Sequence, residues 1–316
     1  MIEKVNLQHI DKKCDYLADI LHDFYLDRDS GSYTSIDVLY NSGSYNIYGQ
    51  VSSNYSASLI ELKNQLSFSE CYGDVSKQKS IDIFNLNLGT FSSQSLYYLD
   101  NNFASDSCVS VGYATTGSGE INGLPLDITL ANIFSAQLSN EPGPAKVIVD
   151  ISKNGVLSID LNAPTTSSFE FCNNMLNIYS DFYTTGSINF NVEGFDDEED
   201  AHSNGMSGMK LQGDLYGSYC SVSSGPLAGR DLLQIDRLST LAARKLAYKI
   251  FEDNNKNVEV RVEFGFKKGR SQPILAKCII DGVETYMEND FSPNSLLEYI
   301  GGRNQTAIKY LNTHID

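Results

Sequence analysis

The sequence predicts an α+β protein of three pseudo-symmetric subdomains, each a mixed or antiparallel sheet with helices on one face. A unit of helix, hairpin and second helix occurs three times along the 316 residues. The first helices of these units begin near Asp11, Leu126 and Leu232, so the unit repeats roughly every 110 residues. The alternative is a two-domain α+β protein whose hairpins are similar by coincidence. The predicted subdomains are residues 1–100, 101–195 and 196–316.

Apolar residues at helical spacing predict the first helix of each unit. In the first unit, Cys14, Leu17, Leu21 and Phe24 recur every three or four residues, which places them on one face of a helix. The three predicted helices are Asp11–Asp27, Leu126–Leu138 and Leu232–Phe251.

A hairpin follows each first helix, and alternation of apolar and polar residues predicts its strands. Glycine in the turns, as at Gly43, supplies the positive φ that tight connections need. The predicted pairs are Tyr33–Tyr40 with Tyr45–Ser52, Lys146–Ser152 with Val156–Leu161 across Lys153-Asn154-Gly155, and Val258–Phe266 with Ile274–Ile280. The predicted second helices are Ala57–Leu66, Phe169–Tyr183 and Asn294–Leu311, the last broken at Gly301-Gly302.

The charge balance narrows the possible partners. The chain carries 40 acidic and 23 basic residues, a net charge of −17. Such a chain repels nucleic acid and anionic membranes, so we expect neither as a partner. The apolar runs are far shorter than the ~20 residues of a membrane helix, and Met1–His9 lacks the features of a signal peptide. We therefore expect a cytoplasmic protein whose anionic ligands would need a local group of cations.

The six cysteines do not form a C-x-x-C pair. This spacing argues against a zinc site, and a chain of this length without a secretion signal is not typical of disulfide-rich proteins. We expect most of the thiols to be buried as small apolar side chains.

The first candidate for chemistry is His9-Ile10-Asp11-Lys12-Lys13, at the start of the first predicted helix. The N–H groups and partial positive charge of a helix N-terminus suit phosphate. His9 and Lys12 add donors, and Asp11 is a possible ligand of Mg²⁺. Taken alone, Asp11 also fits an ordinary capping residue.

The second candidate is the glycine-rich stretch from Gly205 to Arg237. Gly225 and Gly229 bracket a loop in which backbone amides can approach an anion, and Arg230 follows directly. Asp236 then lies near the start of the third long helix. The stretch is not a Walker loop, and by itself it also fits a glycine-rich surface loop.

The third candidate is the segment Asp106–Thr115, a predicted buried strand with a single acid at its start, for which a structural role is the alternative. Together, the three candidates resemble the S-adenosylmethionine synthetase family. His9-x-Asp11-Lys12-x-x-Asp15 is similar to the family's G-H-P-D-K-x-x-D, and Asp106–Thr115 to D-Q-G-L-M-F-G-Y-A-T. The other matches are Gly205–Lys210 with G-L-T-G-R-K, Asp214–Gly217 with D-T-Y-G, Gly225–Asp231 with G-A-F-S-G-K-D, and Asp236-Arg237 with the end of K-V-D-R. They occur in the family's order over nearly the whole chain.

The resemblance implies a methionine adenosyltransferase. In that reaction the sulfur of methionine attacks C5′ of the ATP ribose and expels triphosphate, which is then hydrolysed to phosphate and pyrophosphate. The family uses Mg²⁺ and K⁺, and its active site lies between two subunits, so the resemblance implies a homodimer or a dimer of dimers. Two alternatives remain open: a relative that adenosylates another thioether or only cleaves triphosphate from ATP, and a non-catalytic regulatory paralogue.

The resemblance also implies roles for individual residues. The implied catalytic residues are His9, Lys146, Lys210 and Arg230. ATP contacts are implied for His9, Lys12, Lys146, Phe195, Ser207, Lys210, Gly225, Arg230, Asp231, Asp236 and Arg237. The amino-acid substrate is assigned to Gln50, Asp106 and Ser203, and the metals to Asp11, Asp236 and Asp37, where Asp37 replaces a glutamate that helps to hold K⁺.

Several positions depart from the family pattern. Met209 and Gln234 replace an arginine and a lysine, and a charged hydrogen bond is worth about 1.5–3 kcal/mol. We therefore expect weaker ATP affinity, weaker triphosphate hydrolysis, or both. Gln50 replaces a glutamate that faces the substrate ammonium, and Ser203 replaces an aspartate. Methionine binding should weaken as well, unless the true substrate differs at its amino group.

Overall fold

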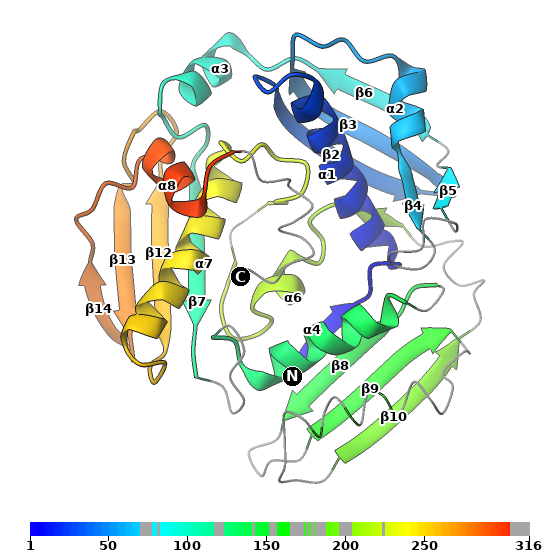
Figure 1. Ribbon diagram of the computed structural model, residues 1–316, viewed down its shortest axis with the longest axis vertical. Coiled ribbons are helices and arrows are strands. Elements are labelled where there is room, and N and C mark those ends of the chain that lie inside the picture. Colours follow the sequence, from blue (N-terminus) through cyan, green and yellow to red (C-terminus); the bar gives the residue numbers. More distant parts are fainter. Residues whose placement is uncertain are drawn as a thin grey trace.

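A computed structural model shows three sheets around the outside of the molecule, with the long helices on their inner sides (Figure 1). The structure describes residues 1–69, 78–80, 83–116, 123–140, 143–151, 157–164, 174, 177, 180, 188–195, 204–222 and 225–303. The α+β class predicted from the sequence is confirmed.

Each of the three large sheets has four strands. The first contains β11 (Gly205–Met206), β2 (Tyr33–Asn41), β3 (Ser44–Ser52) and β6 (Ile83–Gly89), in that order. The second contains β1 (Ile2–Val5), β8 (Lys146–Ile151), β9 (Leu157–Pro164) and β10 (Ile188–Phe195). The third contains β14 (Val283–Tyr286), β13 (Leu275–Ile280), β12 (Val260–Phe266) and β7 (Cys108–Ala114). A smaller sheet pairs β4 (Ser67–Ser69) with β5 (Gln78–Ser80).

The three large sheets share one plan. At the centre of each is an antiparallel hairpin: β2–β3, β8–β9 or β12–β13. One further strand pairs antiparallel with the first strand of each hairpin, namely β11, β1 or β7. On the opposite side, β6 and β10 pair in parallel, whereas β14 pairs antiparallel. The pseudo-symmetry therefore extends to the arrangement of strands, and it breaks only at the last strand of the third sheet.

The sheets do not coincide with the contiguous ranges 1–100, 101–195 and 196–316. Strand β1 from the first range completes the second sheet, β7 from the second range completes the third, and β11 from the third range completes the first. The physical reason is that an open sheet edge needs partners for its N–H and C=O groups, and a strand distant in sequence supplies them as well as a near one. Local periodicity carries no signal for such pairing.

The long helices agree closely with the predictions. They are α1 (Ile10–Arg28), α4 (Leu126–Leu138) and α7 (Ile235–Asp253), so the third begins three residues later than predicted. The shorter helices are α2 (Leu59–Gln65), α3 (Ser93–Asp100), α6 (Leu211–Leu215) and α8 (Pro293–Ile300). Helix α8 is capped at its C-terminus by Gly301, whose φ of 107° is left-handed. The predicted continuation to Leu311 falls mostly after residue 303, where the described residues end. The turn Lys153–Gly155 and most of the predicted helix Phe169–Tyr183 also lie outside them.

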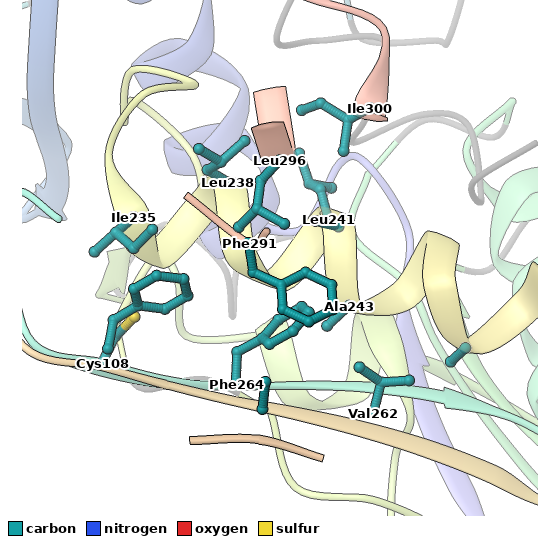
Figure 2. Packing of buried hydrophobic residues seen from close by; sticks show 14 of the residues in the cluster. Cys108, Ile235, Leu238, Leu241, Ala243, Val262, Phe264, Phe291, Leu296 and Ile300 are labelled. Atoms are coloured by element: carbon teal, nitrogen blue, oxygen red, sulfur yellow. The ribbon is translucent and has the colours of Figure 1, made fainter. Parts of the chain in front are cut away.

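Each long helix packs against its own sheet over a separate apolar core. Figure 2 shows the core around α7, where Ala243 lies on the side of Phe264 of β12, and Leu238 and Leu241 lie on the side of Leu296 and Ile300. Phe291 and Leu296, from the segment that leads into α8 and from α8 itself, close the same core. Full burial of a side chain of this size contributes about 1.5–3 kcal/mol, so the alternation in β12 fixes which sheet face meets the helix.

Two further predictions concern the membrane and the thiols. Among the helices that the structure describes, none has both the length and the apolar character needed to cross a membrane. Cys14, Cys108, Cys220 and Cys278 are buried and free, as predicted for these thiols. Burial raises the pKa of the Cys108 thiol to about 12, so it stays protonated at neutral pH.

Gly112 provides a test of the packing between β7 and α7. A Cβ at this position would overlap the carbonyl group of Ala243 in the helix backbone. We expect Gly112→Ala to lower the free energy of unfolding by at least about 2 kcal/mol, because neither backbone can give way. At Gly89 the nearest atom to an added Cβ is 3.8 Å away, so Gly89→Ala is the matched control. Urea unfolding followed by circular dichroism measures both variants, and equal losses would contradict this account.

Candidate active site

The N-terminus of α1 places His9 beside Asp11. His9 is the N-cap, and its Nδ1 accepts the backbone N–H of Asp11 at 3.2 Å. Burial lowers the pKa of His9 to about 4. The negative charge of Asp11 opposes this shift, and the positive charges of Lys210 and Lys146 add to it. The imidazole is therefore neutral at pH 7. Because Nδ1 accepts a hydrogen bond, the proton is on Nε2, which is a donor suited to a phosphate oxygen.

Three further chain segments contribute charge to this helix start. Lys210 Nζ lies 3.8 Å from Asp11 Oδ2 and 3.8 Å from Glu3 Oε1. Lys146 is the first residue of β8, and its charge acts on His9. The structure thus brings together four of the residues implied by the resemblance, His9, Asp11, Lys146 and Lys210. We call these four residues the phosphate cluster. Glu3 also belongs here, although no sequence motif marked it.

Aspartates at four-residue intervals on α1 bind the glycine-rich segments. Asp11 Oδ1 accepts the N–H of Met206 at 2.9 Å, and Asp15 Oδ1 accepts that of Gly208 at 2.7 Å. Asp19 Oδ1 accepts the N–H of Gly229 at 2.8 Å. All three carboxylates lie on one face of the helix, because residues four apart are neighbours there. The segment that carries Lys210 is therefore fixed against the helix that carries His9.

Lys12, the residue after Asp11, belongs to a buried ionic group. Its Nζ is 2.5 Å from Asp214 Oδ2 and 3.5 Å from Asp15 Oδ2. Lys4 Nζ donates to the backbone oxygen of Asp214 at 2.7 Å. Burial raises the pKa of Asp15 to about 7, although the charge of Lys12 opposes the rise. The resemblance implies an ATP contact for Lys12, whereas the structure pairs its ammonium with two carboxylates.

A second group of polar residues lies along the outer edge of β2. Arg230 Nη2 donates to both carboxylate oxygens of Asp37, at 2.9 and 3.0 Å, and its Nη1 donates to the carbonyl of Ile36 at 3.1 Å. Ser207 Oγ donates to Asp37 Oδ1 at 3.4 Å. Asp37 thus contacts both Ser207 and Arg230, and the guanidinium is engaged by Asp37 rather than left open to an anion.

The loop before Arg230 follows the edge of β2 beyond β11. The N–H of Ile36 donates to the carbonyl of Gly229 at 3.0 Å. Gly229 has φ +71°, and a Cβ there would overlap the carbonyl of Ile36, so only glycine allows this approach. Gly225 has φ +94° with open space around it, so its backbone conformation rather than crowding favours glycine.

Two residues to which the resemblance assigns ATP contacts are interior. Asp231 is fully buried and accepts a hydrogen bond from Arg303 Nη2 at 2.6 Å. Arg237, 1% exposed, donates to Asp19 at 2.9 Å and to the carbonyl of Arg230 at 2.8 Å. Both side chains hold the glycine loop in place, and their charges are paired with Arg303 and Asp19.

The remaining predicted residues lie near the start of α7 or outside the described part. Asp236 is in the first turn of α7, where burial, together with the nearby charge of Asp106, raises its pKa to about 6. Gln50 is exposed on β3. Phe195 ends β10, but its side chain is not among those described, and Ser203 lies outside the described residues.

The carboxylates fit Mg²⁺ that arrives with phosphate. Among the residues described, no three His, Cys, Asp or Glu side chains gather into a metal cluster. Mg²⁺ does not require one, since one or two carboxylates together with substrate phosphates commonly hold it. Asp11 in the phosphate cluster, and Asp236 with Asp106 at the start of α7, meet that requirement.

Asp37 does not fit a monovalent cation. Both of its oxygens accept hydrogen bonds from the Arg230 guanidinium. A second cation about 4 Å from that guanidinium would be repelled by about 4 kcal/mol at an effective dielectric constant near 20. The potassium site implied by the resemblance is therefore not available at Asp37.

The protonation state of His9 can be measured by NMR titration. The free protein should show a His9 pKa near 4, below the ordinary 6.5. Because the folded state resists protonation, this residue reduces stability as the pH falls from 6.5 towards 4. Tripolyphosphate should raise the pKa, since an adjacent anion favours imidazolium. His22, which is buried and bonded to Thr34, is the internal control and should not respond. A His9 pKa of 6.5 without ligand would refute the assigned environment.

The buried ionic group predicts a large effect of Asp214→Asn. Removing this carboxylate leaves Lys12 and Lys4 with too little negative charge. We expect a loss of about 2–3 kcal/mol in the free energy of unfolding, somewhat below that of a fully buried pair because Asp214 is 24% exposed. Asp150→Asn is the control, since Asp150 is 41% exposed beside the N-terminal ammonium and its loss should cost about 0.5 kcal/mol. Chemical denaturation compares the two, and a small loss in Asp214→Asn would contradict the assignment.

Comparison with known proteins adds independent information. Residues 199–314 match the family model described as "S-adenosylmethionine synthetase, C-terminal domain". The S-adenosylmethionine synthase of Prochlorococcus marinus subsp. pastoris is 24% identical over 360 residues, which cover 94% of this chain and 82% of the relative. That of Mycoplasma genitalium is 24% identical over 310 residues, with coverage of 89% and 79%.

A solved structure supports the fold. An unusual S-adenosylmethionine synthetase from Campylobacter jejuni superposes with a TM-score of 0.74, 16% sequence identity, and coverage of 98% of this chain and 92% of that one. The matched C-terminal region, the similarity to synthases over most of the chain and the shared fold point the same way. Together they support a divergent member of the S-adenosylmethionine synthetase family.

Proposed function

We propose that the protein is a methionine adenosyltransferase. The sulfur lone pair of methionine would attack C5′ of the ATP ribose while the C5′–O bond breaks, and triphosphate would leave with the bonding electrons. The phosphate cluster carries this proposal. In a chain with a net charge of −17, it gathers two lysines and a neutral histidine donor at the N-terminus of a 19-residue helix.

The residues of the cluster have distinct roles in this proposal. The Nε2–H of His9 would bind the oxygen that departs from C5′, and Lys146 and Lys210 would neutralise charge on the triphosphate, which leaves with about four negative charges. Asp11 and Asp236 would hold Mg²⁺, which when bound stabilises negative charge on phosphate oxygens. Catalysis then consists mainly of positioning and electrostatic stabilisation.

We further propose a homodimer or a dimer of dimers. The phosphate cluster includes the start of α1, whereas Asp236 is in the first turn of α7, Asp106 precedes β7 and Gln50 is on β3. In the proposed assembly, these residues of one subunit face the phosphate cluster of the other, as the family resemblance implies. ATP and methionine would then bind between the two chains, with Ser203 and the Phe195 ring as proposed further contacts.

Gln50 favours one alternative substrate class. An exposed amide on β3 cannot balance the charge of an ammonium group as a carboxylate would. A thioether that lacks a free ammonium would suit this position better than methionine. The reaction at sulfur and the expulsion of triphosphate would be unchanged.

Mass spectrometry of the reaction products tests the proposal. The pure protein with ATP, Mg²⁺ and methionine should form S-adenosylmethionine, phosphate and pyrophosphate. Methionine analogues without a free ammonium should be assayed in parallel. Product from an analogue alone would support the alternative substrate class, and absence of any sulfonium product would reject the proposed activity.

Substitutions in the phosphate cluster test the individual roles. His9→Ala should abolish turnover, and Lys210→Ala should lower kcat/KM about 100-fold, as removal of a single charge-stabilising group commonly does. Lys245→Ala on the exposed surface of α7 is the matched control and should retain activity. Full activity in His9→Ala, measured by the same product assay, would sink the assigned mechanism.

A further inference from the structure

We infer that the guanidinium of Arg230 permanently takes the place of a monovalent cation at Asp37, and that this protein works without K⁺. The part of the inference that concerns activity rests on the proposed function. The part that concerns cation binding rests on the geometry of Arg230 and its neighbours alone. It departs from what family membership implies, because K⁺ accompanies Mg²⁺ in the family.

The guanidinium takes the oxygens that a cation would need. Its Nη2 contacts both oxygens of the Asp37 carboxylate, at 2.9 and 3.0 Å, and its Nη1 contacts the Ile36 carbonyl at 3.1 Å. Carboxylate and backbone oxygens are the ligands that a hard cation prefers. In this part of the structure, all three already accept charge-assisted hydrogen bonds.

The backbone that carries Arg230 is fixed on several sides. Ser35 and Arg230 form an antiparallel bridge, and the carbonyl of Arg230 accepts a hydrogen bond from the buried Arg237 at 2.8 Å. The next residue, Asp231, donates its N–H to the Thr34 carbonyl at 2.9 Å. The Arg230 side chain as a whole is 15% exposed. Its position at Asp37 is therefore part of the pairing along the β2 edge, rather than a chance contact of a mobile side chain.

Arginine suits this role better than lysine. Its planar fork places N–H groups on both carboxylate oxygens together, whereas a lysine ammonium acts as a point charge and leaves room for a second cation. Arginine also stays charged at every physiological pH, so the positive charge beside Asp37 cannot dissociate. An internal cation of this kind makes an exchangeable one redundant.

Two measurements on the unmodified protein form the primary test. The first is the rate of sulfonium product formation in potassium chloride and in tetramethylammonium chloride at equal ionic strength. The second is thallium NMR, which detects a K⁺-like ion without any need for activity. We expect rates that differ by less than about twofold, well under the 5–150-fold typical of ligand coupling. We also expect no saturable thallium site that depends on Asp37.

Variants test whether the guanidinium is the cause. Arg230→Gln removes the charge but leaves the Asp37 carboxylate, so this variant should gain a saturable thallium signal. The matched double variant, Arg230→Gln with Asp37→Asn, should lose it again. A gain in the first variant that disappears in the second supports the inference. No gain in a folded Arg230→Gln protein would overturn it.

The remaining outcomes also separate cleanly. Activation of the unmodified protein by K⁺ of about tenfold or more would overturn the inference, since a tenfold effect is a normal coupling between ligands. So would a saturable thallium site in the unmodified protein that Asp37→Asn abolishes. If no sulfonium product forms in any salt, the proposed function fails, and the thallium measurements still decide the inference about Asp37.

Discussion

The site depends on a row of carboxylates along one face of α1. Asp11, Asp15 and Asp19 accept the backbone N–H groups of Met206, Gly208 and Gly229. A hydrogen bond to a charged group contributes about 1.5–3 kcal/mol, and each of these also fixes a main-chain position without relying on a flexible side chain. His9 is the N-cap of the same helix. Helix α1 therefore fixes the positions of His9, of the segment that carries Lys210 and of the glycine loop relative to one another.

Buried charge in this region is almost fully compensated within the protein. Asp19 pairs with Arg237, and Asp15 and Asp214 pair with Lys12. Such pairs add little net stability, because desolvation offsets their attraction, but they specify one geometry. The charge left to act on an anionic ligand comes mainly from Lys146 and Lys210. Met209 is exposed, and Gln234 donates to the Thr34 carbonyl at 2.6 Å. Neither residue supplies a positive charge, whereas the family pattern has a cation at both positions.

The sequence was sufficient to predict the α+β class, the hairpins and the extents of α1 and α4 closely, because helical and alternating periodicities are local signals. It also predicted that His9, Asp11 and Lys210 belong to one site. It failed where geometry depends on partners far apart in the chain. Nothing in the motifs marked Asp19 or indicated that Asp214 would pair with Lys12. The same motif that identified Arg230 as a phosphate ligand gave no indication that Asp37 would bind it. The exchange of strands among the sheets has the same cause.

That exchange has a consequence for how the protein is made. The hairpin β2–β3 leaves the ribosome early, but its partner β11 follows more than 150 residues later. Strand β1 likewise cannot pair until β8 has been synthesised, and β7 cannot pair until β12 has been synthesised. Synthesis proceeds at about 5–20 residues per second, so unpaired sheet edges persist for seconds on the nascent chain. Such edges promote association with other chains, and pairing of this long range is slow. The topology that unites the three thirds therefore makes early folding intermediates natural clients of chaperones.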